Sequence, residues 1–270
     1  MRDMAEDRTP RVLSIAGSDS GGGAGIQADL KAFARCGVHG MTAVTAITAQ
    51  NTVGVTAVQA VRPEVIVAQV AALVDDIGVD AVKTGMLGDE ATIEAVVAAL
   101  DLLVPGTPVV VDPVMVAESG ADLLDPAARG ALATRILPRA TVVTPNVPEA
   151  ARLAGVPADT GARELARAVH ALGPANVVVT GGHREEATDV FYDGETLTEI
   201  PGERHPGGAA HGSGCTHSAA LAAHLALGHE PLEAARRAKS IAAEAVRDGL
   251  RDVGRGPGPV NALGLGVRVG

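Results

Sequence analysis

The sequence has very few aromatic residues: no tryptophan, one tyrosine and two phenylalanines among 270 residues. A hydrophobic core must therefore consist of Ala, Val, Leu and Ile, and a flat ligand would find almost no aromatic side chain to stack on. Positive charge is also scarce, because 22 Lys and Arg residues stand against 32 Asp and Glu residues and the net charge is −10. A phosphate backbone needs a basic protein face, so this charge argues against a nucleic-acid partner.

Cysteines and long apolar runs are scarce as well. Cys36 and Cys215 are the two cysteines, too few for a disulfide framework in a chain of this length. No run of about 18 apolar, uncharged residues occurs, and the start of the chain lacks the apolar segment of a signal peptide. We therefore expect a cytoplasmic protein with no membrane partner. We predict a flexible tail over residues 1–10 and a single domain over residues 11–270, which show no linker or internal repeat.

Strand-like and helix-like segments alternate along most of the chain. Apolar, β-branched segments predict strands over residues 11–17, 41–49, 79–85, 107–114, 140–146 and 175–182. Apolar residues at helical spacing predict helices over residues 25–37, 63–78, 89–101, 161–173, 215–228 and 231–250. This alternation is typical of an α/β protein whose mostly parallel sheet is buried on both faces. Residues 189–200, with Asp193-Gly194 in the turn, predict a hairpin.

Polar residues follow several of the predicted strands directly. Asp19 comes after the first strand, Asp112 ends the strand over 107–114, Asn146 ends the next, and Thr180 and Gly181 end the strand over 175–182. In open α/β sheets, ligands bind at the carboxyl ends of the strands. The position of these residues therefore predicts a binding site at that edge of the sheet.

The stretch SIAGSDSGGGAG, residues 14–25, matches no common glycine motif fully. It contains the Asp-Ser-Gly-Gly of trypsin-like proteases, but no histidine precedes Ser20. It lacks the G-x-S-x-G of hydrolases and the Gly-Lys-Ser/Thr of a P-loop, and Ile26 stands where a dinucleotide fingerprint has its third glycine. Two interpretations stay open: a tight strand-to-helix turn, or a backbone that something approaches closely, as four glycines in five positions suggest.

A second glycine-rich segment, Gly212-Ser213-Gly214, directly precedes a predicted helix. Free backbone amides at a helix N-terminus, together with the helix dipole, bind anions. Cys215 would lie in the first helical turn, where we expect the pKa of its thiol to fall; a buried structural thiol is the alternative, and Cys36 is expected in the core. The chain also has histidines at 183, 205, 211 and 217, whose spacing predicts no metal site.

Seven stretches in register resemble one family. In chain order they are AGSDSGGGAGIQADLKAF, TAQNTVGV, KTGML, VVDPVM, TPNVPEA, GGH and HGSGCT. They are similar to the hydroxymethylpyrimidine/phosphomethylpyrimidine kinases, a ribokinase-like family, and the resemblance covers residues 12 to 261. It implies a three-layer sandwich with a mostly parallel central sheet flanked by helices, a small β hairpin and no large lid.

The resemblance also implies site residues. In that family the first glycine loop holds the pyrimidine rather than a phosphate. The implied pyrimidine contacts are Gly17, Asp29, Gln50, Met86 and Val114. The implied anion hole consists of the amides of Gly212, Ser213 and Gly214, with Cys215 taking the proton from the substrate hydroxyl. The implied Mg²⁺ zone contains Asp112, Asn146 and Glu149, and the implied nucleotide contacts are Thr180, Gly182 and Lys239. Thr180 and Glu118 stand where many relatives have lysine.

The activity implied is ATP- and Mg²⁺-dependent phosphorylation of 4-amino-5-hydroxymethyl-2-methylpyrimidine to its monophosphate and then its diphosphate, in thiamin diphosphate biosynthesis. The resemblance further implies a homodimer. A pyridoxal or pyridoxine kinase of the same fold is the nearest alternative. A ligand-binding regulator without catalysis is a second alternative. A cysteine-dependent hydrolase is a third, and it would need a His/Asp arrangement around Cys215.

Overall fold

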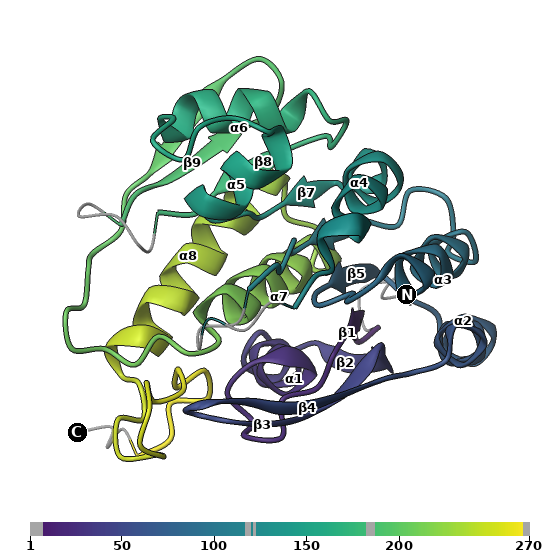
Figure 1. Ribbon diagram of the computed structural model, residues 1–270, viewed down its shortest axis with the longest axis horizontal. Coiled ribbons are helices and arrows are strands. Elements are labelled where there is room, and N and C mark those ends of the chain that lie inside the picture. The colour runs from purple at the N-terminus through teal and green to yellow at the C-terminus, as the bar shows by residue number, and fades with distance from the viewer. Residues whose placement is uncertain (1–7, 117–119, 121–122, 182–186, 267–270) are drawn as a thin grey trace, which may run out of the picture.

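The computed structural model describes residues 8–116, 120, 123–181 and 187–266. An eight-stranded sheet runs through its centre in the order β10-β9-β8-β7-β6-β5-β1-β2 (Figure 1). The strands from β8 through β2 are parallel, and β9 and β10 are antiparallel. The bounds are β1 (Arg11–Ala16), β2 (His39–Val44), β5 (Ala81–Thr84), β6 (Val109–Val111), β7 (Val142–Val143), β8 (Val177–Val179), β9 (Asp189–Tyr192) and β10 (Leu197–Ile200).

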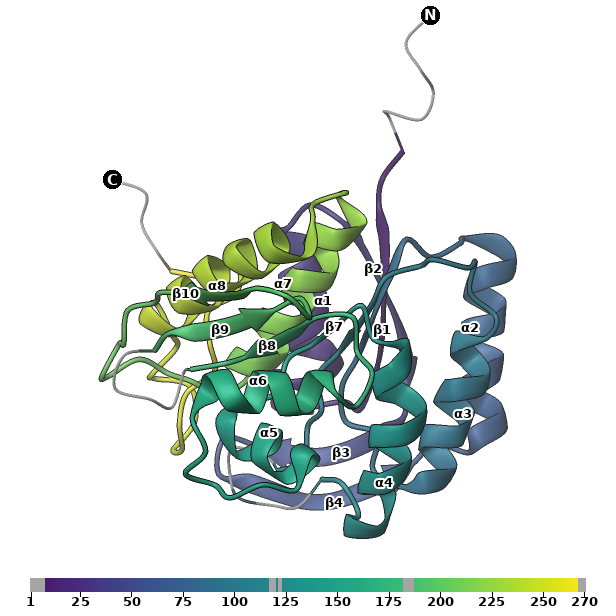
Figure 2. The same ribbon diagram turned by 90° about the horizontal axis from the view of Figure 1, so that it is seen from above.

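Helices cover both faces of this sheet (Figure 2). One face carries α1 (Gly25–Arg35), α7 (Ser213–Ala226) and α8 (Pro231–Arg247). The other carries α2 (Pro63–Asp76), α3 (Glu90–Leu100), α4 (Arg129–Ala131), α5 (Val147–Ala154) and α6 (Ala162–His170), with short 3₁₀ and π turns completing residues 126–139. The predicted ribokinase-like three-layer sandwich is confirmed, and so is the hairpin formed by β9 and β10.

The strands are short and apolar because both of their faces are buried. In β6, Val110 packs into the core beneath α1, α7 and α8, whereas Val109 and Val111 pack into the core on the other side. Side chains that alternate between two helical layers leave no polar face, so such strands are continuous apolar runs in the sequence. Phe33 and Phe191, the two phenylalanines, are both buried in the layer that contains α7.

The single strand predicted over residues 41–49 is wrong. The chain leaves the main sheet at Thr45, between β2 and β3 (Ala46–Asn51). Strand β3 pairs antiparallel with β4 (Gly54–Ala60) in a separate two-stranded sheet. Two hydrogen bonds of Thr45 fix the point at which the chain leaves the main sheet. Its hydroxyl donates to the Met86 carbonyl (2.8 Å) and its N–H donates to the Ala16 carbonyl (3.0 Å). The apolar pattern continues across the break, so it does not show that the two halves belong to different sheets.

The strand order places a switch point at β1. Strand β1 lies between β2 and β5, so the chain proceeds to one side of β1 after α1 and to the other side after α2. Loops that diverge in this way leave a crevice at the carboxyl ends of the strands, which is where ligands bind in such sheets. Within the described part of the chain, no helix is long and apolar enough to cross a membrane.

Candidate active site

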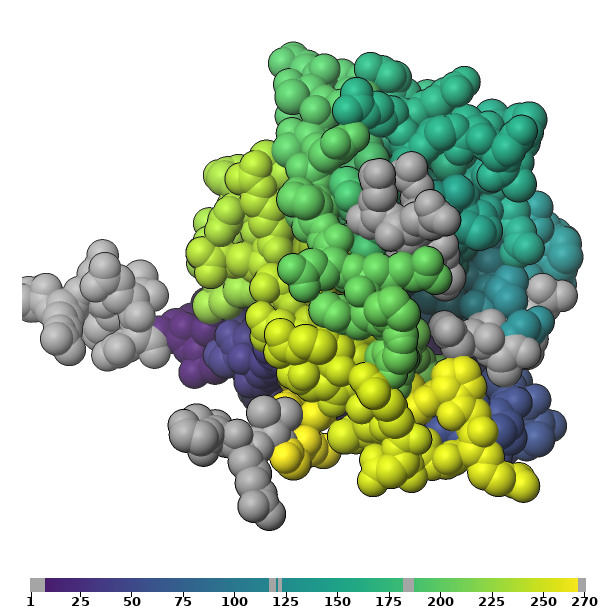
Figure 3. Space-filling view, turned by 90° about the vertical axis from the view of Figure 1, so that its left-hand side faces the viewer, coloured from purple at the N-terminus to yellow at the C-terminus, as the bar shows by residue number. Residues whose placement is uncertain are grey.

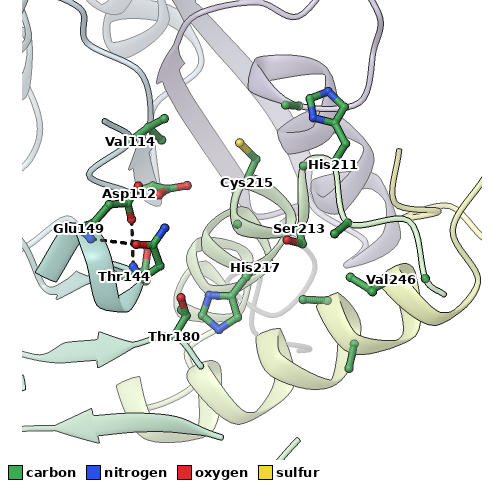
Figure 4. A pocket seen from close by; sticks show the side chains of 18 of the residues that line it. Asp112, Val114, Thr144, Glu149, Thr180, His211, Ser213, Cys215, His217 and Val246 are labelled. Atoms are coloured by element: carbon green, nitrogen blue, oxygen red, sulfur yellow. Dashed lines mark hydrogen bonds between the residues drawn. The ribbon is translucent and has the colours of Figure 1, made fainter. Parts of the chain in front are cut away.

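A cavity of about 490 Å³ lies at the carboxyl edge of the sheet. The residues that follow five parallel strands all line it: Gly17, Met86, Asp112, Thr144 and Thr180. The N-terminal turn of α7 forms another wall, and Figure 4 shows Cys215 and Ser213 there, across from Asp112. Residues 203–208 also line the cavity, and they belong to the green strip beside α8 and the C-terminal residues in Figure 3. Three of the positions predicted from the strand ends, Asp112, Asn146 and Thr180, therefore lie around one space, whereas Asp19 and Gly181 do not line it.

The start of α7 has the geometry of an anion site. Gly212 is the N-cap residue with φ of +84°, and no side chain caps the helix. The N–H of Ser213 donates to the Ala210 carbonyl at 2.9 Å, so it is already engaged, contrary to the expected set of three converging amides. Gly214 and Cys215 follow as first-turn residues whose amides have no acceptor within the helix. These two amides and the helix dipole face the cavity and favour a negatively charged group there.

The prediction that the pKa of Cys215 falls is wrong. Burial raises the pKa of this thiol to about 12, and the carboxylates of Asp29 and Asp112 raise it further, while the Lys83 ammonium opposes both effects. The side chain is half-buried in the cavity wall. The helix start is thus only one of several influences on the thiol, and desolvation dominates.

A buried lysine occupies the floor of the site. Lys83, in β5, is fully buried, and its ammonium donates to both carboxylate oxygens of Asp29 at 3.0 Å. The Ser14 hydroxyl donates to the same carboxylate at 2.6 Å. Lys83 lines the cavity, whereas Asp29 lies behind it and does not. Asp29 was expected to contact the pyrimidine directly; the structure instead places it as the partner that neutralises Lys83, because a fully buried charge needs a counter-ion.

The predicted metal residues lie close together on the opposite wall. Asn146 caps α5 by accepting the Glu149 N–H, and Glu149 accepts the Asn146 N–H, both at 2.9 Å. Burial raises the pKa of Glu149 to about 8, and the nearby charge of Asp112 adds to this. Asp112 accepts the Ser218 hydroxyl at 2.8 Å.

These residues fit a magnesium ion held mainly by water and phosphate. The described residues contain no cluster of three or more His, Cys, Asp or Glu side chains able to enclose a metal. Mg²⁺ typically takes one or two carboxylates and fills its remaining positions with water and substrate phosphates. Asp112 and Glu149 supply hard oxygen ligands of that kind on the cavity wall, and a cation between them would relieve their mutual repulsion.

The expected pyrimidine contacts other than Asp29 line one end of the cavity. Gln50 comes from β3, Met86 follows β5, and Val114 follows β6. Gly17 leaves room for Met86, because a Cβ at position 17 would overlap the end of the Met86 side chain. The arrangement offers one amide and two apolar side chains to a small heterocycle.

The glycine run at the start of the chain serves mainly to pack loops together. Asp19 accepts backbone N–H bonds from Gly21, Gly23 and Ala24 at 2.8–3.0 Å, and its Oδ2 is 2.9 Å from Nε2 of His211. Among the glycines of residues 21–25, Gly25 lines the cavity and the other three do not. A Cβ at position 23 would overlap the His211 ring. Only the ends of this loop therefore reach the cavity in which a substrate would lie, and the structural role of Asp19 was missed.

Two of the three expected nucleotide residues, Thr180 and Lys239, line the cavity. Thr180 follows β8, and Lys239 on α8 donates to Asp189 Oδ1 at 2.6 Å. Gly182 and Glu118 lie outside the described residues. His217, which the spacing of histidines did not mark, also lines the cavity (Figure 4). The sequence signal that points to it is its place four residues after Ser213 on one helix face.

A parallel sheet with its cavity at the switch point, a helix N-terminus aimed into that cavity, and carboxylates on the facing wall define a ribokinase-like small-molecule kinase. The family model for phosphomethylpyrimidine kinase matches residues 19–261. The chain is 49% identical to the hydroxymethylpyrimidine/phosphomethylpyrimidine kinase of Rhizobium meliloti, over 94% of this chain and 97% of that one. It is 44% identical to the kinase of the same name from Mycobacterium tuberculosis, over 94% of each chain.

This chain belongs to the phosphomethylpyrimidine kinase family. Solved structures of two kinases share its fold. An ADP complex of Bacillus subtilis pyridoxal kinase superposes with a TM-score of 0.87 at 40% identity, covering 97% of this chain and 100% of that one. Phosphomethylpyrimidine kinase from Clostridium difficile superposes with a TM-score of 0.77 at 40% identity, covering 87% and 99%.

Proposed function

We propose that this enzyme transfers the γ-phosphoryl group of ATP to the hydroxymethyl group of 4-amino-5-hydroxymethyl-2-methylpyrimidine, and then a second phosphoryl group to the resulting monophosphate. The product, a diphosphate, serves thiamin diphosphate biosynthesis. The observation that carries the proposal is that a helix start, a thiol, two carboxylates and the side chains of Gln50, Met86 and Val114 line one shared cavity. The family membership and the names of the relatives support the same substrate.

Cys215 is the proposed base of the first transfer. Its thiolate would accept the proton of the substrate hydroxyl while the amides of Gly214 and Cys215 hold the phosphoryl group. Phosphoryl transfer depends chiefly on positioning and on neutralising charge, and a helix N-terminus supplies both. The Lys83 ammonium favours the thiolate against the effect of burial. Asp29 keeps Lys83 charged and fixed in the cavity floor.

Gln50 and the two apolar side chains are the proposed pyrimidine contacts. An amide both donates and accepts, so Gln50 can pair with the exocyclic amine and a neighbouring ring nitrogen. Met86 can pack against the ring face through its polarizable sulfur, which suits a cavity in a chain without tryptophan. Val114 would close the other side. Asp29 takes no direct part, because Lys83 separates it from the cavity.

Asp112 and Glu149 are the proposed magnesium-side residues, with Asn146 fixing Glu149 through the capping box. When bound, Mg²⁺ neutralises charge on the nucleotide phosphates. Thr180, Lys239 and the segment containing Gly182 are the proposed nucleotide contacts.

Pyridoxal is a second candidate substrate. The ADP complex of Bacillus subtilis pyridoxal kinase and the pyridoxal kinase of Staphylococcus aureus with AMP-PCP and pyridoxal both match over nearly the whole chain, with TM-scores of 0.87 and 0.86. Pyridoxal also presents a hydroxymethyl group on a small heteroaromatic ring, so the same cavity could accept it.

An ADP-release assay with each substrate in turn tests these proposals. Mass spectrometry of the products should show mono- and diphosphate from the pyrimidine, with a higher kcat/KM than for pyridoxal. A higher kcat/KM for pyridoxal would reverse the assignment. Binding of the pyrimidine without any ADP release would instead favour a ligand-binding regulator.

A homodimer and a cytoplasmic location complete the proposal. Ile47 on β3, Val58 on β4 and Val53 in the turn between them are each more than half exposed (58%, 55% and 53%), and a second copy of the chain would cover such apolar side chains. The cytoplasm supplies the ATP that the reaction consumes, and both cysteines are free thiols, as that compartment favours.

A further inference from the structure

The structure buries the imidazole of His217 in the wall of the cavity. It lies on α7 one turn after Ser213 and projects into the same cavity as Ser213 and Thr180 (Figure 4). Only 4% of the residue is exposed. Neither ring nitrogen forms a hydrogen bond with any residue that the structure describes. Buried polar groups are almost always paired, so an unpaired imidazole in a binding cavity indicates that a ligand atom completes it.

Two charged groups lie beside the ring. The Nε2 atom of His217 is 3.6 Å from Oδ2 of Asp189 on β9, and this oxygen also has no partner among the described residues. The other oxygen of Asp189 accepts hydrogen bonds from Lys239 on α8 and from the Gly181 N–H. Burial lowers the pKa of His217, and Lys239 lowers it further, while Asp189 opposes both. These effects together favour the neutral form of the ring near pH 7.

The ring lies over the helix start, where the phosphate site is proposed. Side chains on a helix point back toward its N-terminus, so His217 covers the turn that begins at Ser213. A nucleotide whose terminal phosphate lay at that helix start would extend its remaining phosphates past this turn toward Thr180 and Lys239, which line the same cavity. One edge of the ring faces the Asp189 carboxylate, and the other edge would then face a phosphate oxygen.

We propose that His217 gains a proton when the nucleotide binds and then bridges Asp189 and the nucleotide, donating Nε2–H to Asp189 Oδ2 and Nδ1–H to a phosphate oxygen. A neutral imidazole has one donor and one acceptor, so it cannot serve two acceptors at once. The second proton comes from solvent. Two anionic partners favour the imidazolium form, whereas the buried ring alone does not. This inference rests on the proposed function, because it requires a nucleotide in the cavity.

Calorimetry of ADP binding in the presence of Mg²⁺ tests the inference. Titrations at about pH 7, near the range where histidine changes charge, in two buffers of different ionisation enthalpy give the number of protons taken up per nucleotide. The wild-type protein should take up a larger fraction of a proton than His217→Gln, whose amide stays neutral. The variant should also bind ADP about tenfold more weakly at that pH, as expected for the loss of a charge-assisted hydrogen bond, and the difference should shrink at alkaline pH.

His224→Gln is the matched control. His224 lies on the same helix, is buried, and has two ring nitrogens without a partner among the described residues, but it does not line the cavity. Its replacement should leave proton uptake and ADP affinity at the wild-type values. Loss of uptake in this variant as well would mean that the effect comes from the helix rather than from the His217 bridge.

Nitrogen NMR of the wild-type ring gives a second measurement if His217→Gln does not fold. Addition of ADP should move the His217 ring signals to the imidazolium pattern. Equal proton uptake in wild type and His217→Gln, or a ring that stays neutral with ADP bound, would overturn this inference alone. A wild-type protein that binds no ADP would contradict the proposed function, and the inference with it.

Discussion

Cys215 illustrates how much a single side chain depends on its surroundings. The sequence places it in the first turn of a helix, which favours a thiolate, but the folded protein buries it beside two carboxylates. Desolvation of an ion outweighs a helix dipole that is worth about 0.3–1 kcal/mol at a surface. The Lys83 ammonium opposes the effect of burial on the pKa of Cys215. The sequence did not mark Lys83 as a functional residue, because it stands in the largely apolar segment VDAVKTG.

Replacement of Cys215 by Ala should lower kcat of the first phosphorylation by about 10²–10⁴, the range for a lost general base. The second phosphorylation should lose much less, because its acceptor phosphate is already anionic. Quenched-flow analysis of mono- and diphosphate formation measures the two steps separately. Cys36→Ala is the control, because Cys36 is outside the cavity at the end of α1 and should leave both steps unchanged. Equal losses in both steps of Cys215→Ala would argue against a base.

Glu149 should make stability depend on pH in the absence of metal. Its pKa is raised from 4.5 to about 8 in the folded protein, chiefly by burial. Between these values the folded protein holds a proton that the unfolded chain releases, so the contribution of Glu149 to stability falls as the pH rises through this window.

Glu149→Gln cannot ionise, so it removes the loss of stability that ionisation of Glu149 causes. Its amide oxygen can still accept the Asn146 N–H. The variant should therefore gain stability relative to wild type as the pH rises from 5 to 8, by roughly 2 kcal/mol or more, since each pKa unit corresponds to about 1.4 kcal/mol. Urea denaturation in EDTA at several pH values measures the difference. A difference that does not change with pH would show that Glu149 ionises normally in the folded protein.

At the scale of elements, the two glycine-rich segments form one packed unit. The loop after β1 and the loop before α7 meet at the contact between Gly23 and Gly212. The sequence shows two glycine clusters nearly 200 residues apart, and each has its own local explanation. Only the fold shows that the two glycine clusters meet at one contact that leaves no room for a side chain. It also shows that a hydrogen bond between the side chains of Asp19 and His211 joins the two loops.

Gly212→Ala should disturb this contact, whereas Gly214→Ala should not. A Cβ at position 212 would overlap the Gly23 carbonyl oxygen, and φ of +84° is strained for alanine. We expect a loss of roughly 2 kcal/mol or more, which corresponds to a fall in Tm of roughly 4–8 °C in a chain of this size. No atom lies within 4 Å of a Cβ at position 214, so that variant should melt at or slightly above the wild-type temperature. Similar Tm values for the two variants would show that the loops do not constrain each other.

The apolar patterns predicted most helices and strands because burial on both sheet faces makes strands apolar and helices one-sided. They did not predict β4, because most of its residues are exposed and the strand therefore lacks the apolar pattern that a buried face produces. They also did not find the helical turns over residues 126–139. Thr45, where the chain changes sheets, has no special residue type, since the departure depends on bonds to Ala16 and Met86 far away in sequence.

At the scale of the whole molecule, the proposed homodimer is the feature that most needs a direct test. Ile47→Asp or Val58→Asp places a charge among the exposed apolar side chains of the β3–β4 sheet. If this sheet forms the interface, light scattering should show a dimer for wild type and a monomer for each variant, because a buried unpaired charge is strongly unfavourable. Val104→Asp, which changes another exposed apolar residue (70% exposed) away from that sheet, is the control and should remain a dimer.

The sequence by itself determined the α/β architecture, the family and the residue types available for chemistry, because hydrophobic period and local motifs are properties of neighbouring residues. The tertiary structure alone decided which of those residues share a cavity and what charge each one carries there. It placed Asp29 outside the cavity as the partner of Lys83, raised the pKa of Cys215 and brought His217 into the cavity wall. Desolvation and charge pairing depend on groups that are distant in the chain and become neighbours only on folding.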